Sequence, residues 1–414
     1  MSESKEAMMA VSNKTTIDVA SLPGVVILAG ASAVTRMPTE VFSKGACSFL
    51  AELSKALLND AKSKLWPDVV SFAYWCRRSN IDAERRARES RLCNRLGRGI
   101  AFHITPSNVP VNFAFSWAFS LLAGNSSVVR VPSRPFAQID AILNVVQPLL
   151  QEYPEVLCRS TFVRYPASSG ATELISTFSD VRVIWGGDST VAAVRSCPCM
   201  PRCVDVCFSD RYSIAVLGAR GIAQMNGEEL SKVAHAFYND TYLMDQNACS
   251  SPQTVVWQGD QESIQEARAV FWAAVRSEVH KRYELQPAIV MDKYVQACSD
   301  LIKNRVSGVE RHDGYLSTAE LSKAHALSEL NRGTGGYFYE KSVGDFSEVL
   351  DAVDERYQTI TFAGIDGEDL RRQVLRCRAR GIDRVVPLGQ AMNLGLLWDG
   401  YDLVETLSRK IARV

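Results

Sequence analysis

The sequence has 414 residues, of which 47% are hydrophobic and 22% are charged. This composition is typical of a folded chain with more than one domain and excludes a disordered protein. Lys and Arg (46) balance Asp and Glu (46), which excludes a strong bulk attraction to nucleic acid or to an anionic membrane.

Residues 1–16 are polar and mixed in charge, without the apolar segment of a signal peptide. No apolar run further along is long enough to span a membrane. Eleven cysteines, an odd number, favour reduced thiols over a disulfide framework. We therefore expect a cytoplasmic enzyme or enzyme-like protein of the α/β class.

Two helices are predicted first, near 39–63 and 83–96, and from residue 99 short apolar runs alternate with segments of helical length. The predicted strands are 100–104, 127–131, 161–165, 181–185 and 212–217. The helices between them are 111–122, 136–150, 171–178 and 189–196. This alternation predicts a doubly wound, mostly parallel sheet, whose ligands bind at the carboxyl ends of the strands.

A second α/β region follows a helix at 228–242. Its predicted elements are strands at 253–257, 337–340, 359–362 and 384–388, with helices at 261–283, 292–304 and 366–380. A terminal helix at 401–412 carries an apolar stripe that includes Leu403 and Leu407, so we expect it to pack against the protein. We predict two domains, the first covering 1–244 with 385–414 returning to it, and the second covering 245–384.

Cys249 lies in the segment Asp245–Gln253, where a helical pattern ends and a strand-like run begins. Small neighbours such as Ala248 and Ser250 would let a substrate carbonyl approach the thiol. A helix-to-strand junction can expose a side chain while both flanking elements hold it in place. The pattern therefore favours Cys249 as a nucleophile.

A strand, a loop and a helix are predicted across Gly97–Pro110. Pro106 and Pro110 restrict the backbone of the loop, and Asn108 carries an amide donor at the end of the strand. Acyl chemistry needs a donor that faces the developing oxyanion. The alternative for Asn108 is that it caps the helix that follows.

Two further strand ends carry groups that suit a nucleotide. Near the end of 127–131 the chain presents Arg130, Ser133 and Arg134, and after 181–185 it presents a Gly186-Gly187 turn and the start of a helix. Backbone amides at such a turn suit a phosphate group. The Gly-Gly turn is not specific, because the sequence has no G-x-G-x-x-G fingerprint.

Together these segments resemble the aldehyde dehydrogenase superfamily, and more closely its LuxC branch, the acyl-CoA (long-chain fatty acyl) reductases. The resemblance covers most of the chain from Gly97 onward. The segments that carry it are Thr105–Pro110, Gly124-Asn125, Gly186-Gly187, Gln246–Gln253, Arg384–Met392 and Trp398–Gly400. It implies an aldehyde-dehydrogenase-like fold of two doubly wound domains, with the active site between them.

By this resemblance Cys249 takes the acyl group from a thioester, and the Asn108 amide faces the thiohemiacetal oxyanion beside the Cys249 N–H. The cofactor-binding positions that it implies are Thr105, Pro106, Arg130, Ser133, Gly186, Gly187 and Ser189. Arg134 adds a second cation that favours the 2′-phosphate of NADPH over NADH. The first domain is then the NADP-binding domain and the second the catalytic domain, with no metal in the site.

One departure from the superfamily bears on the reaction. Oxidative aldehyde dehydrogenases carry a glutamate base in a Glu-Leu-Gly-Gly-Lys segment, and the corresponding stretch here, 204–211, has no such motif. That base activates the water that hydrolyses the acyl-enzyme, a step that a reductase must avoid. The absence favours reduction of acyl-CoA, or of another acyl carrier, to an aldehyde, although Asp205 or Asp210 stays open as a base.

The resemblance also implies partners. Relatives supply long-chain aldehydes, for example to bacterial luciferase, and work with an acyl-protein synthetase and an acyltransferase. The superfamily forms homo-oligomers, so we expect one here. No group that would activate Cys249 is identified, since His235 lies fourteen positions away on a predicted helix, roughly 21 Å along its axis.

Two other classes of function stay open. One is a cysteine acyltransferase or thioesterase that uses no hydride. The other is a thiol or metal sensor built on Cys197, Cys199, Cys203 and Cys207, although their spacing is not that of a zinc ribbon or a ferredoxin. A basic run between Arg77 and Arg98 favours a solvated helix face with ion pairs four residues apart, with contact to CoA phosphates as the alternative.

Overall fold

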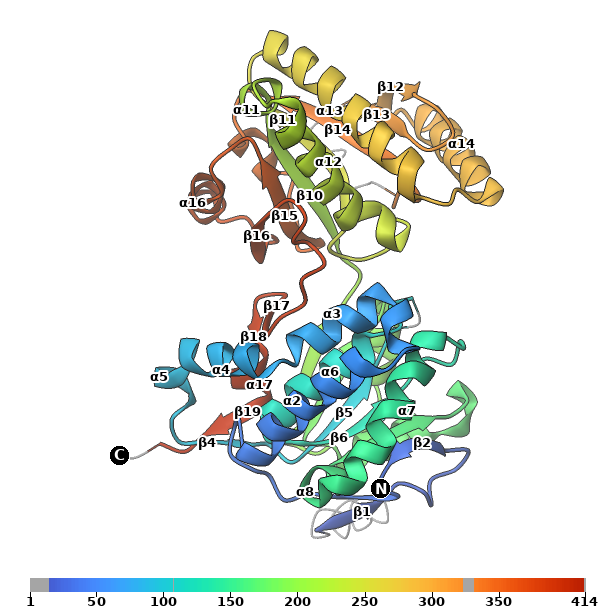
Figure 1. The fold of residues 1–414 in the computed structure, drawn as a ribbon, viewed down its shortest axis with the longest axis vertical. Helices are drawn as coiled ribbons and strands as arrows, with labels where there is room; N and C mark the ends of the chain where they lie inside the picture. Colours follow the sequence, from blue (N-terminus) through green and yellow to red (C-terminus); the bar gives the residue numbers. More distant parts are fainter. Residues whose placement is uncertain (1–14, 107, 323–330, 413–414) are drawn as a thin grey trace. The chain divides into compact units, whose positions relative to one another are not determined.

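The structure is a computed structural model that describes residues 15–106, 108–322 and 331–412 (Figure 1). The chain forms two compact units, one from Met1–Ser209 with Gly395–Val414 and one from Asp210–Leu394. Each unit holds one large, mostly parallel sheet with helices in its crossovers, which confirms the predicted α/β class. No helix in the described part of the chain is long and apolar enough to cross a membrane.

The sheet of the first unit has the strand order β2-β7-β6-β5-β8-β9. Its strands are β2 (Val26–Gly30), β5 (Ile100–Ile104), β6 (Ser126–Arg130), β7 (Ser160–Arg164), β8 (Val181–Trp185) and β9 (Val204–Phe208). All neighbours are parallel except β2 and β7. Taken in chain order, the parallel strands follow the order 3-2-1-4-5, so the winding reverses between β5 and β8.

Helices surround this sheet (Figure 1). They are α2 (Lys44–Asn59), α3 (Pro67–Trp75), α4 (Arg78–Ala87), α5 (Glu89–Leu92), α6 (Asn112–Leu122), α7 (Ala137–Glu152), α8 (Pro154–Leu157), α9 (Ala171–Phe178), α10 (Asp188–Arg195) and α17 (Leu403–Leu407), with short 3-10 turns at Ser63–Leu65 and Ala167–Ser169. Helix α6 is buried along its whole length, because it packs on β5 and β6 while α2 and α17 pack against it. Its nearly continuous apolar sequence reflects this central position.

Small antiparallel pairs complete the first unit. They are β1 (Thr16–Asp18) with β3 (Ala33–Thr35), β17 (Leu397–Trp398) with β18 (Tyr401–Asp402), and β4 (Arg95–Gly97) with β19 (Ser408–Lys410). The last pair ties the C-terminal segment to the strand that precedes β5.

The sheet of the second unit has the strand order β12-β13-β14-β11-β10-β15-β16. Its strands are β10 (Tyr212–Gly218), β11 (Pro252–Gln258), β12 (Val306–Arg311), β13 (Ser317–Leu321), β14 (Tyr337–Val343), β15 (Tyr357–Ala363) and β16 (Arg384–Pro387). Only β12 runs antiparallel to its neighbour. Strands β14, β11, β10, β15 and β16 repeat the order 3-2-1-4-5 of the first unit.

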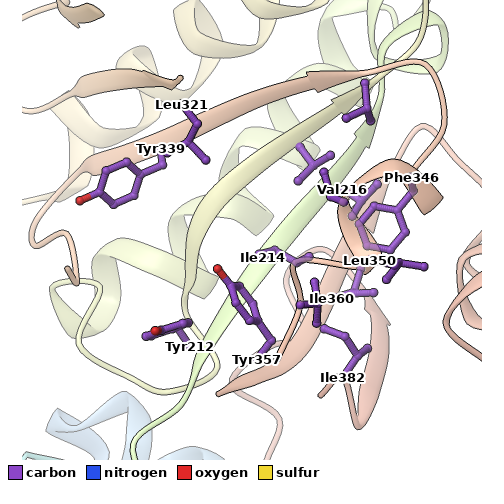
Figure 2. Packing of buried hydrophobic residues seen from close by; sticks show 14 of the residues in the cluster. Tyr212, Ile214, Val216, Leu321, Tyr339, Phe346, Leu350, Tyr357, Ile360 and Ile382 are labelled. Carbon is purple, nitrogen blue, oxygen red and sulfur yellow. The ribbon is translucent and has the colours of Figure 1, made fainter. Parts of the chain in front are cut away.

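The two faces of this second sheet are covered by different helices, which are α11 (Ala219–Ala223), α12 (Gly227–Thr241), α13 (Gln261–Arg282), α14 (Pro287–Ile302), α15 (Ser347–Leu350) and α16 (Gly367–Cys377). Figure 2 shows the face where Ile214 and Val216 of β10 pack with Ile360 and Leu350. Their neighbours Ala215 and Leu217 point to the other face, against α12 and α13. The alternation follows from the two-residue period of a strand.

Most predicted elements are confirmed, and the strands 100–104 and 181–185 and the helix 171–178 match residue for residue. The helix predicted at 83–96 is wrong in its bounds, since α4 begins at Arg78 and α5 ends at Leu92. The terminal helix at 401–412 is also wrong, because Ser408 leaves the helix to pair with β4. Leu403 and Leu407 are buried as predicted, whereas Ile411 is 48% exposed.

The division of the chain also differs from the predicted boundary at 244 and 245. Strand β10 pairs with β11 on one side and β15 on the other, so it belongs to the second unit. At the other end β16 pairs with β15, and the chain returns to the first unit at Gly395 rather than at 385. Hydrogen bonding between strands distant in sequence therefore sets the boundaries.

Candidate functional site

Cys249 lies at the amino-terminal edge of the second sheet, in the loop between a 3-10 turn (Tyr242–Met244) and β11. Helix α12 leads into this loop and begins with a capping box in which Asn226 and Glu229 satisfy each other's backbone N–H groups. The thiol is partly exposed, while Ala248 and Ser250 on either side are buried. The predicted junction between helix and strand is thus confirmed.

The loop contains two consecutive residues in the left-handed region, Asp245 (φ 50°) and Gln246 (φ 63°). This backbone conformation is strained for residues other than glycine and persists only where the surroundings fix it. The Tyr283 hydroxyl donates to Asp245 Oδ1 at 2.6 Å, and the Asp245 carbonyl accepts from the Gly335 N–H at 3.1 Å. Interactions far along the chain therefore hold the turn before Cys249.

Two buried glutamines fix the same loop. The Gln246 amide donates to the carbonyls of Pro252 (3.2 Å) and Tyr337 (2.9 Å) and accepts from the Gly336 N–H (3.2 Å). Gln253 donates from Nε2 to the Gln246 carbonyl at 2.8 Å and accepts at Oε1 from a backbone N–H at 2.8 Å. The sequence motif Gln246–Gln253 thus begins and ends on residues that hold the cysteine loop.

Cys249 itself is held by two neighbouring strands. The Ser213 hydroxyl of β10 donates to the Cys249 carbonyl at 2.9 Å, and the Gln358 side chain of β15 donates from Nε2 to the Cys249 sulfur at 3.6 Å. Sequence reasoning missed both residues, because each is distant in sequence and carries no motif. The only signal was a polar side chain near the start of an apolar strand.

Ion pairs line the same edge of the second sheet. Arg332 donates to Asp210 at 2.6 Å and to the Asn247 carbonyl at 3.2 Å, two residues before Cys249. Arg211 forms an ion pair with Asp383. Asp210, which was open as a base, therefore forms an ion pair with the Arg332 guanidinium.

A buried carboxylate holds the segment that follows β16. Asp240 of α12 accepts from the Gly389 N–H at 2.6 Å and from the Ala391 N–H at 2.9 Å. Burial raises the pKa of Asp240 to about 7. This segment reaches the cysteine loop, where Ser250 donates to the Met392 sulfur at 3.5 Å.

The predicted cofactor positions lie at the carboxyl edge of the first sheet. Thr105 follows β5, and its hydroxyl donates to the carbonyl of Arg130, the last residue of β6, at 2.7 Å. Asn108 is exposed in the loop before α6. The alternative that Asn108 caps this helix is wrong, because the N-cap is Val111 and no side chain caps it.

Three polar side chains lie at the end of β6 or just after it. The Arg130 guanidinium lies 4.7 Å from the ring centre of Tyr165. Burial raises the pKa of this tyrosine to about 12. Ser133 and Arg134 are exposed, and Arg134 lies 5.1 Å from the ring centre of Phe136. Neither arginine forms an ion pair with a carboxylate within the described ranges, which leaves both charges for an anionic ligand.

Gly186 and Gly187 form the turn between β8 and α10, next to the switch point between β5 and β8. Gly187 is the N-cap of α10, and the space where a Cβ would stand is open. Ser189 is exposed in the first turn of the helix. The chemistry of these residues suits a dinucleotide, because cations, a hydroxyl and the start of a helix follow neighbouring parallel strands. Asp188, in the same first turn, opposes a phosphate by its charge.

The remaining histidine and carboxylate candidates have structural roles. His235 is bound through Nδ1 to Glu278 at 2.7 Å. His103 is fully buried in β5 next to the Ser116 hydroxyl (2.7 Å), and burial lowers its pKa to about 3. Asp205 forms a two-pronged ion pair with buried Arg182, at 2.7 Å for both bonds, so it is engaged as a structural anchor.

The cysteine cluster is a partly buried turn between α10 and β9. Burial raises the pKa of Cys203 to about 12, and the nearby Cys199 thiol adds to the shift. Across residues 15–106, 108–322 and 331–412, no group of three or more His, Cys, Asp or Glu side chains could hold a metal ion. In the basic run, Arg78–Asp82 and Arg88–Glu84 are ion pairs four residues apart, as predicted, but only the first pair is solvated, because Arg88 is largely buried and also binds Asp402.

The amino-acid sequence of this chain is similar to those of acyl reductases. Residues 77–410 match the family model described as acyl-CoA reductase (LuxC). A long-chain acyl-protein thioester reductase 2 from Photobacterium leiognathi is 22% identical over 323 residues, 76% of this chain and 63% of that protein. A long-chain acyl-protein thioester reductase from Photorhabdus laumondii is 23% identical over 325 residues, 77% of this chain and again 63% of that protein.

Solved aldehyde dehydrogenases share the fold. A 1-pyrroline-5-carboxylate dehydrogenase mutant of Thermus thermophilus aligns over 99% of this chain and 96% of that chain, with a TM-score of 0.58 and 11% identity. Aldehyde dehydrogenase 21 of Physcomitrella patens aligns over 88% of this chain and 84% of that chain, with a TM-score of 0.60 and 11% identity. At this identity the likeness is one of fold alone.

Proposed function

The chain belongs to the acyl-CoA reductase (LuxC) family, and from this premise we propose that it reduces an acyl thioester to an aldehyde with NADPH as the hydride donor. The curated relatives are named long-chain acyl-protein thioester reductases, and the matched region spans 63% of their length. The substrate is accordingly a long-chain acyl group carried on a protein or on coenzyme A.

The observation that carries the proposal is the fixed, partly exposed thiol of Cys249. Both glutamines of the loop are buried and hydrogen-bonded, so the loop holds a strained turn immediately before the cysteine. Strain that the surroundings fix in this way is characteristic of catalytic sites. A free thiol with a structural role alone would not need a partly exposed position supported by two strands.

In the proposed reaction the Cys249 thiolate attacks the carbonyl carbon of the thioester. A bond from this carbon to the Cys249 sulfur forms, the bond to the carrier sulfur breaks, and the carrier thiolate takes a proton from water. The reduced nicotinamide supplies a hydride to the acyl carbon when it is bound. Hydride transfer leaves a thiohemiacetal oxyanion, and its oxygen re-forms the carbonyl double bond as the bond to the Cys249 sulfur breaks, which releases the aldehyde and regenerates the Cys249 thiolate.

Two groups are proposed to stabilise the oxyanion in these steps. They are the side-chain amide of Asn108 and the backbone N–H of Cys249, by resemblance to the superfamily. The Asn108 side chain suits this role because it is exposed and does not cap α6.

The cofactor would bind at the carboxyl edge of the first sheet. Thr105 and Pro106 follow β5, while Gly186, Gly187 and Ser189 would lie beside the pyrophosphate. Arg130, Ser133 and Arg134 would surround the adenosine ribose, and the two guanidinium groups favour a 2′-phosphate. We therefore propose NADPH as the preferred donor over NADH.

The stretch 204–211, which lacks the glutamate motif, contains two carboxylates, and their ion pairs favour reduction over hydrolysis. Asp205 is held by Arg182, and Asp210 is held by Arg332. Both carboxylates are thus engaged by guanidinium groups, and we propose that neither of them activates water. An acyl group on Cys249 would then persist until it is reduced.

The test is to incubate the purified protein with acyl-CoA thioesters of several chain lengths and either reduced nicotinamide. We expect aldehyde and oxidised NADPH in equal amounts. Release of free fatty acid without oxidation of NADPH would identify a thioesterase. Transfer of the acyl group to an added acceptor without oxidation would identify an acyltransferase.

A further inference from the structure

The residue that acts on the Cys249 thiol has no sequence motif, and we propose that it is Gln358. This inference rests on the proposed function, in which the Cys249 sulfur is the reacting atom. The Gln358 side chain donates from Nε2 to that sulfur at 3.6 Å. Gln358 thus touches the reacting atom as a catalytic residue, and its amide stabilises the thiolate that attacks the acyl group and later leaves it.

The fold directs Gln358 toward the cysteine by an irregularity in β15. Tyr212 pairs with Tyr357 and Ile214 pairs with Ile360, so β15 holds one more residue than β10 over this stretch. Such a bulge interrupts the alternation of side chains and redirects one of them, and bulges are common next to active sites. Gln358 lies within the bulge, which explains how a side chain of a central strand reaches the loop at its end.

A second bulge lies where β10 pairs with its other neighbour, β11, again next to Ser213. Ser213 pairs with Pro252 and Ile214 pairs with Thr254, so the extra residue in β11 is Gln253. Gln253 is one of the two glutamines that hold the cysteine loop. Both neighbours of β10 are therefore irregular at the same level, and each irregular residue directs an amide to the loop of Cys249.

The orientation of the Gln358 amide is fixed by its neighbours. The Thr359 hydroxyl donates to Gln358 Oε1 at 3.3 Å, so the amide oxygen accepts there while Nε2 donates to the sulfur. Ser213 accepts from the Thr359 N–H at 3.2 Å and donates to the Cys249 carbonyl. The same short network thus holds the main chain of the nucleophile and the donor to its side chain.

The chemistry of this contact favours the charged form of the sulfur. Gln358 is completely buried, and a hydrogen bond to a charged acceptor is stronger than one to a neutral acceptor in such surroundings. A thiolate accepts from the amide N–H, whereas a neutral thiol accepts only weakly. The amide carries no charge, so it lowers the cost of forming the thiolate without pairing it in a salt bridge.

The test measures the thiol directly by the pH dependence of its alkylation with iodoacetamide. Because the chain has eleven cysteines, the product is quantified for the Cys249 peptide by mass spectrometry. In Gln358→Leu we expect the midpoint of the pH profile to rise by about one unit, which is a roughly tenfold slower reaction near neutral pH. Gln358→Glu, which is isosteric, should shift the midpoint further upward, because it adds a negative charge.

Gln373→Leu is the matched control, since Gln373 is a buried glutamine of the same unit that binds Asp369 in α16. Its alkylation profile should equal that of the native protein. If both Gln358 variants also keep the native midpoint, the role of Gln358 is refuted. Persistent reductase activity in Cys249→Ala would instead refute the proposed function, while the alkylation profile would still report on Gln358.

Discussion

The two sheets follow the same winding order, yet their proposed functional residues lie at opposite edges. The first sheet gathers the predicted cofactor residues at its carboxyl edge, after β5, β6 and β8. The second sheet holds Cys249 at its amino edge, before β11 and next to the starts of β10 and β15. The general rule for doubly wound sheets therefore accounts for the proposed cofactor site but not for the position of the proposed nucleophile.

The difference lies in how each edge is built. At the carboxyl edge of the first sheet, Ser133, Arg134 and Ser189 are exposed, and the space beside Gly187 is open. At the amino edge of the second sheet, buried glutamines and two bulges hold a loop in one conformation. The first edge is suited to reversible binding and the second to holding one reacting atom in place.

The largest effect should follow from loss of Gln246. Gln246→Leu removes the hydrogen bonds of its side chain to the Pro252 and Tyr337 carbonyls and to the Gly336 N–H, and each buried group that stays unpaired costs roughly 1–3 kcal/mol. We expect kcat to fall by about a hundredfold or more because the strained turn before Cys249 relaxes. Urea unfolding and steady-state kinetics would measure both effects, with Gln373→Leu as control. Native kinetics in the Gln246 variant would show that the loop needs no such support.

The next effect concerns stability of the first unit in acid. Burial lowers the folded-state pKa of His103 to about 3, so the unfolded chain takes up a proton near its usual pKa of 6.5 while the folded chain does not. The contribution of His103 to the free energy of unfolding should therefore be fully present above pH 6.5. It should fall as the pH drops toward 3, by about 2 kcal/mol at pH 5.

His103→Leu tests this dependence by removing the titrating group. The free energy of unfolding of the first unit, followed by urea denaturation at pH 7 and pH 5, should lose most of its pH dependence in this variant. An equal loss in the native protein and in the variant would assign the acid sensitivity to other groups.

A smaller effect is expected at the carboxyl edge of the first sheet. Arg134→Ala removes an exposed cation that has no carboxylate partner within the described residues. We expect about a tenfold weaker affinity for NADPH and little change for NADH, since only NADPH has the 2′-phosphate. Titration calorimetry with both dinucleotides would measure the ratio. An equal loss for NADH would place Arg134 elsewhere on the ligand.

The smallest effect should come from Asp188 in the first turn of α10. Asp188→Asn removes a negative charge beside the proposed pyrophosphate site and should tighten binding of both dinucleotides by roughly two- to fivefold. The gain should shrink at high salt because it is electrostatic. Weaker binding in this variant would mean that the carboxylate is itself a ligand contact.

The first edge could be predicted from sequence because its signals are local. Strands β5 and β8 are short apolar runs that end in turn residues, and Thr105 and Gly186 follow them directly. Cys249 was found in the same way, from the junction between a helical pattern and an apolar strand. In each case neighbours in sequence are also neighbours in space.

The supporting residues could not be predicted because they depend on pairing between distant segments. Gln358 reaches Cys249 only through the bulge that forms when β15 pairs with β10. The same reason explains why the prediction for the terminal segment was wrong. The apolar stripe predicted a helix, but Ser408 belongs to a strand because it pairs with β4. Strand register carries this information, and local patterns do not.

The most direct test of the account is to locate the acyl group on the protein. The enzyme is mixed with a labelled long-chain acyl-CoA in the absence of nicotinamide, digested, and mapped by mass spectrometry. We predict label on the peptide that contains Cys249, its loss as aldehyde when NADPH is added, and no label in Cys249→Ala, while Cys203→Ala is labelled normally. Label on another residue, or stable label in Cys249→Ala, would contradict the account.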